Sequence, residues 1–85
     1  MRPVVPWMTK SDDAILELLL ETGIAVPPAV ISYNIAVSHP TVRRRLPKLL
    51  EHELVEKVDE SKGYYEITEK GRQYLAGDLD ADDLE

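Results

Sequence analysis

The segment 38–50 constrains the fold more than any other part of the chain. It begins with Ser38, a residue type that favours helix N-termini, and its apolar residues recur at positions 42, 46, 49 and 50. This spacing predicts a helix with one buried face. The segment also contains Arg43, Arg44 and Arg45 in succession and no acidic residue, although the chain of 85 residues has a formal net charge of −6. A basic ridge on an acidic protein indicates a polyanionic partner.

The same periodicity orients the basic residues. At about 100° per residue, Thr41, Arg44 and Lys48 lie together on the side opposite the apolar positions. Arg44 points most directly away from the expected core. Arg43 and Arg45 flank this ridge, and for them a structural role is the alternative, in which the aliphatic stem packs on the core and the guanidinium pairs with a carboxylate such as Glu21 or Glu51.

Three further helices are predicted from capping residues, helix-ending glycines and apolar periodicity. The first is capped by Ser11 and closed by Gly23, the second covers residues 29–35 after Pro27-Pro28, and the last runs from the cap Thr68 to Gly77. Because about three residues separate the second helix from the helix that starts at Ser38, the two are expected to form a helix-turn-helix.

Two strands are predicted at residues 54–58 and 64–67, joined by a polar turn that ends in Gly63. They would form a hairpin, or wing. Residues 24–26 are long enough only for a single extended pairing. The expected fold class is therefore α+β and mainly helical, with a three-helix core, a two-stranded wing and a C-terminal helix.

The first helix is apolar around most of its circumference. Only Asp13, Glu17 and Glu21 form a narrow polar strip, so the helix must be covered on two sides. The second side is covered either by the apolar arm 4–8 or by the same helix of a second subunit. The need for this second cover is the main reason to expect a homodimer. Trp7, the only tryptophan, is expected to anchor the arm rather than to stack on a ligand. The expected dimer interface consists of Trp7, Met8, Ile15, Leu16 and Leu20.

The chain divides into an arm (1–10), one small domain (11–77) and an acidic tail (78–85). The tail contains five carboxylates, and without it 11 acidic residues face 10 basic ones, a charge of −1. Such a tail is expected to be a solvated, mobile end. A calcium loop is the alternative, but the tail lacks the glycine and the terminal glutamate at the positions that such a loop requires.

Several functional classes are disfavoured by composition. There is no cysteine, so disulfides and thiolate chemistry are excluded. We find no phosphate-binding glycine loop, paired-histidine metal spacing or nucleophile motif, so we expect neither an enzyme nor a cofactor. Because no apolar run approaches the length of a membrane span, we expect a soluble, cytoplasmic protein.

The order of elements and two local strings resemble the winged helix-turn-helix transcription regulators. The first string, Ser38-x-x-Thr41-Val42-x-x-Arg45-Leu46-x-x-Leu49, is similar to their recognition helix. The second, Tyr65-Glu66-Ile67-Thr68-Glu69-Lys70-Gly71-Arg72-x-Tyr74-Leu75, is similar to the segment that joins their wing to the last helix. The resemblance covers about residues 11–77.

Three further strings narrow the resemblance. They are Asp12-Asp13-x-Ile15-Leu16-x-Leu18, Pro27-Pro28-x-Val30-Ile31-x-Tyr33-Asn34 and Arg45-Leu46-Pro47-x-Leu49. Together with the acidic, cysteine-free composition, they resemble the phage-repressor-like regulators of haloarchaea. The resemblance implies a sequence-specific, DNA-binding transcriptional repressor that acts as a homodimer on double-stranded DNA.

In this docking class, the start of the recognition helix faces the base edges of the major groove. His39, Pro40 and Thr41 would then lie nearest the bases, Arg44 would read guanine and Lys48 would contact phosphate. The alternative for His39 is an ordinary surface position. The residues expected to contact DNA are Ser38, His39, Pro40, Thr41, Arg43, Arg44, Arg45, Lys48, Lys62 and Tyr64, and Lys57 of the wing is a secondary candidate.

Two positions depart from the family pattern. Glu53 occupies a place where these regulators commonly have glycine, so we expect a turn of different shape there. Pro47 lies inside the recognition helix, where it must either kink the helix or end it near Arg45. We favour the kink, because the apolar stripe keeps its phase across Pro47.

One rival function remains open. A winged helix can serve only for protein contacts, since fold does not fix function, and a charge of −6 repels DNA at long range. The basic segment 38–50 opposes this interpretation. High acidity also fits a cytoplasm rich in salt, where screening shortens electrostatic repulsion to about 3 Å.

Overall fold

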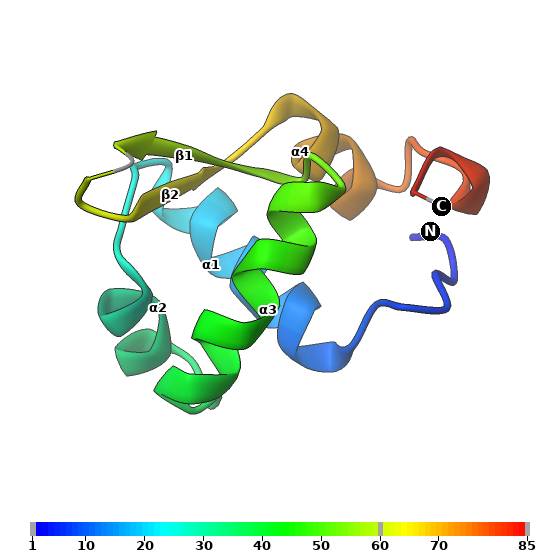
Figure 1. Ribbon diagram of the computed structural model, residues 1–85. Coiled ribbons are helices and arrows are strands. Elements are labelled where there is room, and N and C mark those ends of the chain that lie inside the picture. The colour runs from blue at the N-terminus through cyan, green and yellow to red at the C-terminus, as the bar shows by residue number, and fades with distance from the viewer. Residues whose placement is uncertain (1, 60, 85) are drawn as a thin grey trace.

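A computed structural model describes residues 2–59 and 61–84 (Figure 1). The helices are α1 (Lys10–Thr22), α2 (Pro28–Asn34), α3 (His39–Glu51) and α4 (Glu69–Ala76), and the strands are β1 (Val55–Asp59) and β2 (Tyr64–Ile67). A short 3-10 helix, η1 (Ala81–Leu84), follows α4. β1 and β2 form a two-stranded antiparallel sheet. The mainly helical winged helix-turn-helix fold that the sequence predicted is confirmed.

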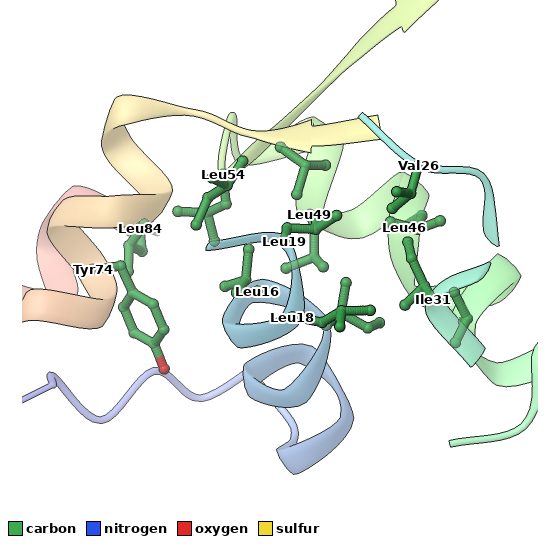
Figure 2. Packing of buried hydrophobic residues seen from close by; sticks show 14 of the residues in the cluster. Leu16, Leu18, Leu19, Val26, Ile31, Leu46, Leu49, Leu54, Tyr74 and Leu84 are labelled. Carbon is green, nitrogen blue, oxygen red and sulfur yellow. The ribbon is translucent and has the colours of Figure 1, made fainter. Parts of the chain in front are cut away.

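The core lies between α1, α3 and the base of the wing. Ile15, Leu16 and Leu19 of α1 are fully buried, and α3 adds Val42, Leu46 and Leu49 from its apolar stripe. Figure 2 shows Ile31 and Leu46 at one end of this cluster and Tyr74 and Leu84 at the other. The core therefore extends from the helix-turn-helix to the C-terminal segment.

The first helix starts earlier than predicted. Its N-cap is Thr9 rather than Ser11, because Thr9 and Asp12 form a reciprocal capping box. Thr9 Oγ1 accepts a hydrogen bond from the Asp12 backbone N–H at 3.3 Å, and Asp12 Oδ2 accepts one from the Thr9 backbone N–H at 2.8 Å. The predicted ends at Gly23 and Gly77 are confirmed, since both glycines adopt the left-handed conformation.

Residues 24–26 form the single extended pairing that their length predicted. Val26 and Tyr65 make an isolated antiparallel bridge, with both backbone N···O distances at 2.9 Å. This bridge attaches the segment before α2 to the wing. It therefore fixes the wing against the helix-turn-helix.

The turn between α3 and β1 corrects the expectation for Glu53. Glu53 itself adopts the left-handed conformation, with φ of 62°. The N–H of Leu54 donates to the carbonyl of Leu49, and the N–H of Glu53 donates to the carbonyl of Leu50, which are the two bonds of a Schellman motif. The turn thus keeps the shape that glycine usually provides, although a glutamate occupies it.

The acidic tail is packed against the domain, which contradicts the prediction of a mobile end for residues 78–84. Leu84 is fully buried, and its carbonyl accepts a 2.8 Å hydrogen bond from Trp7 Nε1. The arm also packs, because Val5 is buried and Arg2 Nε donates to the carbonyl of Leu75 at 3.2 Å. The two ends of the chain therefore lie side by side (Figure 1).

This packing also corrects part of the expected dimer interface. Ile15 and Leu16 have no exposed surface within one chain, so they cannot contact a second subunit. Within the chain, Arg2 of the arm pairs with Glu17 of α1 and Tyr74 of α4 bonds Asp13 of α1, so both the arm and α4 lie against this helix. Of the other expected residues, Trp7 and Met8 are half-buried and Leu20 is exposed. For these three a role in an interface stays a prediction.

Candidate nucleic-acid interface

The start of α3 has the form expected of a recognition helix. Ser38 is the N-cap, its Oγ accepts from the Thr41 backbone N–H at 3.3 Å, and it also donates to Thr41 Oγ1 at 2.9 Å. His39 and Pro40 are exposed in the first turn. The capping bonds fix the side chains of Ser38 and Thr41 beside these two exposed residues.

The three consecutive arginines point in three different directions. Arg44 is exposed to solvent, Arg43 lines a groove beside the wing, and Arg45 points toward α1. Successive residues of a helix are rotated by about 100°, so three neighbours cannot share one face. Arg43 and Arg45 therefore flank Arg44, as the sequence predicted, and of the three only Arg43 and Arg44 are exposed.

Arg45 forms an ion pair with Asp12 of α1. Its Nε and Nη2 donate to the two carboxylate oxygens of Asp12, each at 2.8 Å, and Nη2 also donates to the carbonyl of Trp7 at 3.0 Å. The hydrogen bond with Asp12 raises the pKa of the Arg45 guanidinium above its ordinary value. This outcome matches the structural alternative considered for Arg45, with Asp12 in place of Glu21 or Glu51.

Lys48 also lies away from the groove. Its ammonium is 3.8 Å from a Glu51 carboxylate oxygen and 5.9 Å from the centre of the Trp7 ring. The Trp7 ring in turn stacks on the His52 ring with a centroid distance of 4.0 Å. Lys48 therefore belongs to the side of α3 that meets the N-terminal arm, and Trp7 anchors that arm as predicted.

A groove of about 450 Å³ lies between α3, the start of α2 and the wing. Its basic residues are His39 and Arg43 from α3 and Lys57 and Lys62 from the wing. None of the described residues that line it is acidic. Its remaining walls are Pro27, Pro28, Ala29, Leu46, Pro47, Gly63 and Tyr65. A positively charged groove with apolar walls is suited to a polyanion.

The wing presents opposite charges on its two faces. Lys57 pairs with Tyr65 and Val55 with Ile67, so these residues share the face that continues the core toward the groove. Glu56 pairs with Glu66 on the other face. The pKa of Glu66 is raised mainly because its protonated form can donate to Glu56, and also by burial and by repulsion from Glu56. Glu56 and Glu66 are thus turned away from the groove, and the third acidic residue of the strands, Asp59, lies at the wing tip.

From the sequence, Lys57 was only a secondary candidate for contact with DNA, and Tyr65 was not a candidate. Strand alternation was the signal available for both, because Lys57 is two residues from the apolar Val55 and Tyr65 is two residues from Ile67. Lys57 Nζ lies 5.8 Å from the centre of the Tyr65 ring. Tyr64, which was predicted to contact DNA, is exposed outside the groove lining.

The wing tip is held by Asp59. Its Oδ1 accepts hydrogen bonds from Ser61 Oγ at 2.8 Å, Ser61 N at 3.1 Å and Lys62 N at 3.2 Å. The bond from Ser61 is the main reason why the pKa of Asp59 lies below its ordinary value. This turn places the exposed Lys62 at the rim of the groove.

Pro47 lies in the groove wall, and α3 continues through it to Glu51. The alternative in which the helix ends near Arg45 is therefore wrong. A kink at Pro47 stays a prediction. Because proline has no N–H, the carbonyl of Arg43 lacks its usual helical donor.

Among the described residues, no helix is long and apolar enough to cross a membrane. The described part of the chain also has no group of three or more His, Cys, Asp or Glu side chains that could hold a metal ion. The expectation that no cofactor is bound stays a prediction.

The fold, the capped α3 and the wing define a winged helix-turn-helix domain. Residues 1–85 match the model of the winged helix-turn-helix phage repressor family, and the chain belongs to that family. It is 36% identical over 83 residues to the repressor protein of Halobacterium phage phiH, covering 95% of this chain and 93% of that one. The crystal structure of the PhiH1 repressor-like protein from Haloarcula marismortui is similar with a TM-score of 0.82 at 40% identity, covering 95% of this chain and 91% of that one. The family is thus one of winged helix-turn-helix repressors.

Proposed function

We propose that this protein is a transcriptional repressor that binds double-stranded DNA in the cytoplasm through α3 and the wing. The observation that carries the proposal is the groove, which Arg43, Lys57 and Lys62 line and in which no described lining residue is acidic. Asp59, which accepts a hydrogen bond from the Lys62 backbone, lies outside this lining. This concentration of positive charge occurs in a chain with a net charge of −6. Membership of a phage repressor family supports the same role.

The basic residues lie at positions suited to two kinds of contact, with bases and with phosphates. Arg44 is exposed on the outward side of α3, where a guanidinium can bond both acceptors of a guanine in the major groove. His39 and Pro40 accompany it at the exposed start of the helix. Arg43, Lys57 and Lys62 are suited to the phosphate backbone, which positions the protein without reading sequence. Ser38 and Thr41 support the helix start and approach the DNA with it.

We further propose a homodimer that reads two half-sites about one helical turn apart. In the described part of the chain, Leu20 is an exposed apolar residue of α1, and Ile24 just beyond that helix is more exposed still. The half-buried Trp7 and Met8 remain candidates at the margin of such an interface.

The test begins with selection of a binding duplex from a random double-stranded library, followed by fluorescence anisotropy at several salt concentrations. Wild-type protein should prefer the selected duplex over a shuffled one, and log affinity should fall linearly with log salt. Arg44→Gln should reduce this preference about tenfold or more, since a bidentate base contact contributes about 1–3 kcal/mol of discrimination.

Lys62→Gln should behave differently from Arg44→Gln. It should weaken binding to both duplexes equally and reduce the salt slope by about 0.9 for each phosphate that the protein no longer neutralises. Arg72→Gln on α4 is the matched control, because it makes the same change of charge at an exposed site outside the groove. Absence of any DNA binding by wild-type protein at the lowest salt that keeps it folded would favour the protein-contact alternative instead.

A further inference from the structure

Asp12 is a buried carboxylate at the junction of three segments. Its side chain has no exposed surface, and it lies at the third residue of α1. One oxygen accepts from the Thr9 backbone N–H and from Arg45 Nη2, and the other accepts from Arg45 Nε. Arg45 Nη2 also bonds the carbonyl of Trp7 in the arm. Asp12 therefore links the start of α1, the N-terminal arm and the middle of α3.

The link has a direct geometric consequence for the basic side chains of α3. Two residues along a helix correspond to a rotation of about 200°, so fixing Arg45 toward α1 fixes Arg43 on nearly the opposite side, toward the groove. Arg44 lies between them and points outward. A rotation of α3 about its axis would break both bonds of the Asp12–Arg45 pair and would move Arg43 and Arg44 away from their present directions.

Pro47 makes this link more important for α3 than it would be for an ordinary helix. The carbonyl of Arg43 receives no hydrogen bond from residue 47, so the backbone is less restrained in the turn that bears the arginines. The bidentate bond from Arg45 to Asp12 lies within this same turn. Since a guanidinium and a carboxylate match in plane and spacing, the bond restrains orientation as well as distance.

We propose that Asp12 is a positioning residue for DNA recognition, which sets the rotation of α3 through Arg45 so that Arg43 and Arg44 face the duplex. This inference rests on the proposed function. It assigns a recognition role to an acidic residue that lies inside the protein, and it removes Arg45 from the set of DNA ligands. Asp12 and Arg45 act on the DNA only through the direction of their neighbours.

The test uses Asp12→Asn, which keeps the shape of the side chain and an acceptor for Thr9 but removes the charge that holds Arg45. Anisotropy is measured with the duplex selected by the wild-type protein and with its shuffled form, well below the unfolding temperature of each variant. We expect about a tenfold loss of preference for the selected duplex. This loss would occur although the variant carries one negative charge fewer, a change that by itself favours binding to DNA.

Asp13→Asn is the matched control, with the same charge change one residue along α1. The carboxylate of Asp13 accepts a hydrogen bond from Tyr74 rather than from α3, so its loss should leave the preference unchanged. The double variant Asp12→Asn/Arg45→Gln removes the bidentate ion pair without leaving either charge unpaired. It should lose preference while its salt slope stays at the wild-type value.

Two results would overturn the inference while the proposed function stands. One is wild-type preference in folded Asp12→Asn, which would reduce Asp12 to a purely stabilising role. The other is a fall of about 0.9 in the salt slope of the double variant, which would show that Arg45 contacts a phosphate directly. Failure of the wild-type protein to bind any duplex would overturn the proposed function and this inference together.

Discussion

At the scale of single residues, the protein separates side chains that are adjacent in sequence. Arg43, Arg44 and Arg45 have the same chemistry but end in a groove, in solvent and in a buried ion pair. A buried carboxylate such as Asp12 requires a partner, because removing one charge from such a pair leaves the other uncompensated in the interior. The need to pair Asp12 therefore explains why one of the three arginines is turned toward α1.

The buried Tyr74 should make the stability of the protein depend on pH in the alkaline range. Burial is the main cause that raises the pKa of Tyr74, and its hydroxyl also donates a 2.6 Å hydrogen bond to Asp13. In the unfolded chain the hydroxyl ionises near pH 10. A group whose pKa is raised by folding stabilises the protein below the unfolded pKa and loses this contribution as pH rises through and above it. Wild-type protein should therefore lose stability above about pH 10 more steeply than Tyr74→Phe.

Urea unfolding at a fixed salt concentration and at several pH values between 8 and 11.5 measures this difference. The comparison with Tyr74→Phe removes the shared titration of lysines and of the three other tyrosines, since the chain has four. Parallel pH profiles for the two proteins would show that the Tyr74 hydroxyl does not couple to folding.

At the scale of elements, helix starts and ends were the most predictable features. Ser38, Thr68, Gly23 and Gly77 act as expected because each satisfies backbone groups that a helix leaves unpaired. The sequence predicted the start of α1 two residues late, at Ser11, because serine is a favoured N-cap. The observed start is set by the Thr9-x-x-Asp12 capping box, whose spacing can be read in the sequence.

Other element-scale features could not be predicted from local sequence. Glutamate intrinsically disfavours the left-handed conformation, so tertiary contacts must hold Glu53 in it. The carbonyl of Glu53 accepts from Thr68 Oγ1 at 2.6 Å, and the carbonyl of Leu54 accepts from the Thr68 N–H at 3.1 Å. These bonds come from the segment after the wing, which is distant in sequence, and Leu54 is fully buried.

The packing of η1 on the domain can be tested by truncating Leu84. The charge of the tail suggested a solvated end, but Leu84 is fully buried, its carbonyl accepts a hydrogen bond from Trp7, and Leu79 packs against the core. Leu84→Ala should destabilise the protein by about 2–3 kcal/mol, the lower part of the range for a buried leucine, since the segment is terminal. It should also shift the emission of Trp7 to longer wavelength as the indole becomes hydrated.

Thermal unfolding and fluorescence of Leu84→Ala are compared with Leu50→Ala, in which the truncated leucine is 37% exposed. The control should change stability by less than about 1 kcal/mol and leave the emission unchanged. Equal effects of the two substitutions would contradict the account of the tail.

At the scale of the whole molecule, basic and acidic side chains are concentrated on different surfaces. The groove collects basic residues from α3 and the wing, whereas Glu56 and Glu66 lie on the outer face of the wing and the tail carries Asp78, Asp80, Asp82 and Asp83. The fold class was predictable from sequence because capping, periodicity and turn signals agreed with one another. The groove was only partly predictable, since its basic residues come from two elements whose relative placement depends on tertiary contacts such as the Val26–Tyr65 bridge.

Chemical-shift mapping tests the central claim, that the groove face binds DNA, most directly. Amide resonances of labelled protein are recorded before and after addition of the selected duplex. We predict the largest changes in residues 38–47 of α3 and 57–65 of the wing, with small changes in α4 and in the tail. Changes concentrated on α4, the tail or the outer face of the wing would contradict the account, because they would place the DNA on the acidic side of the molecule.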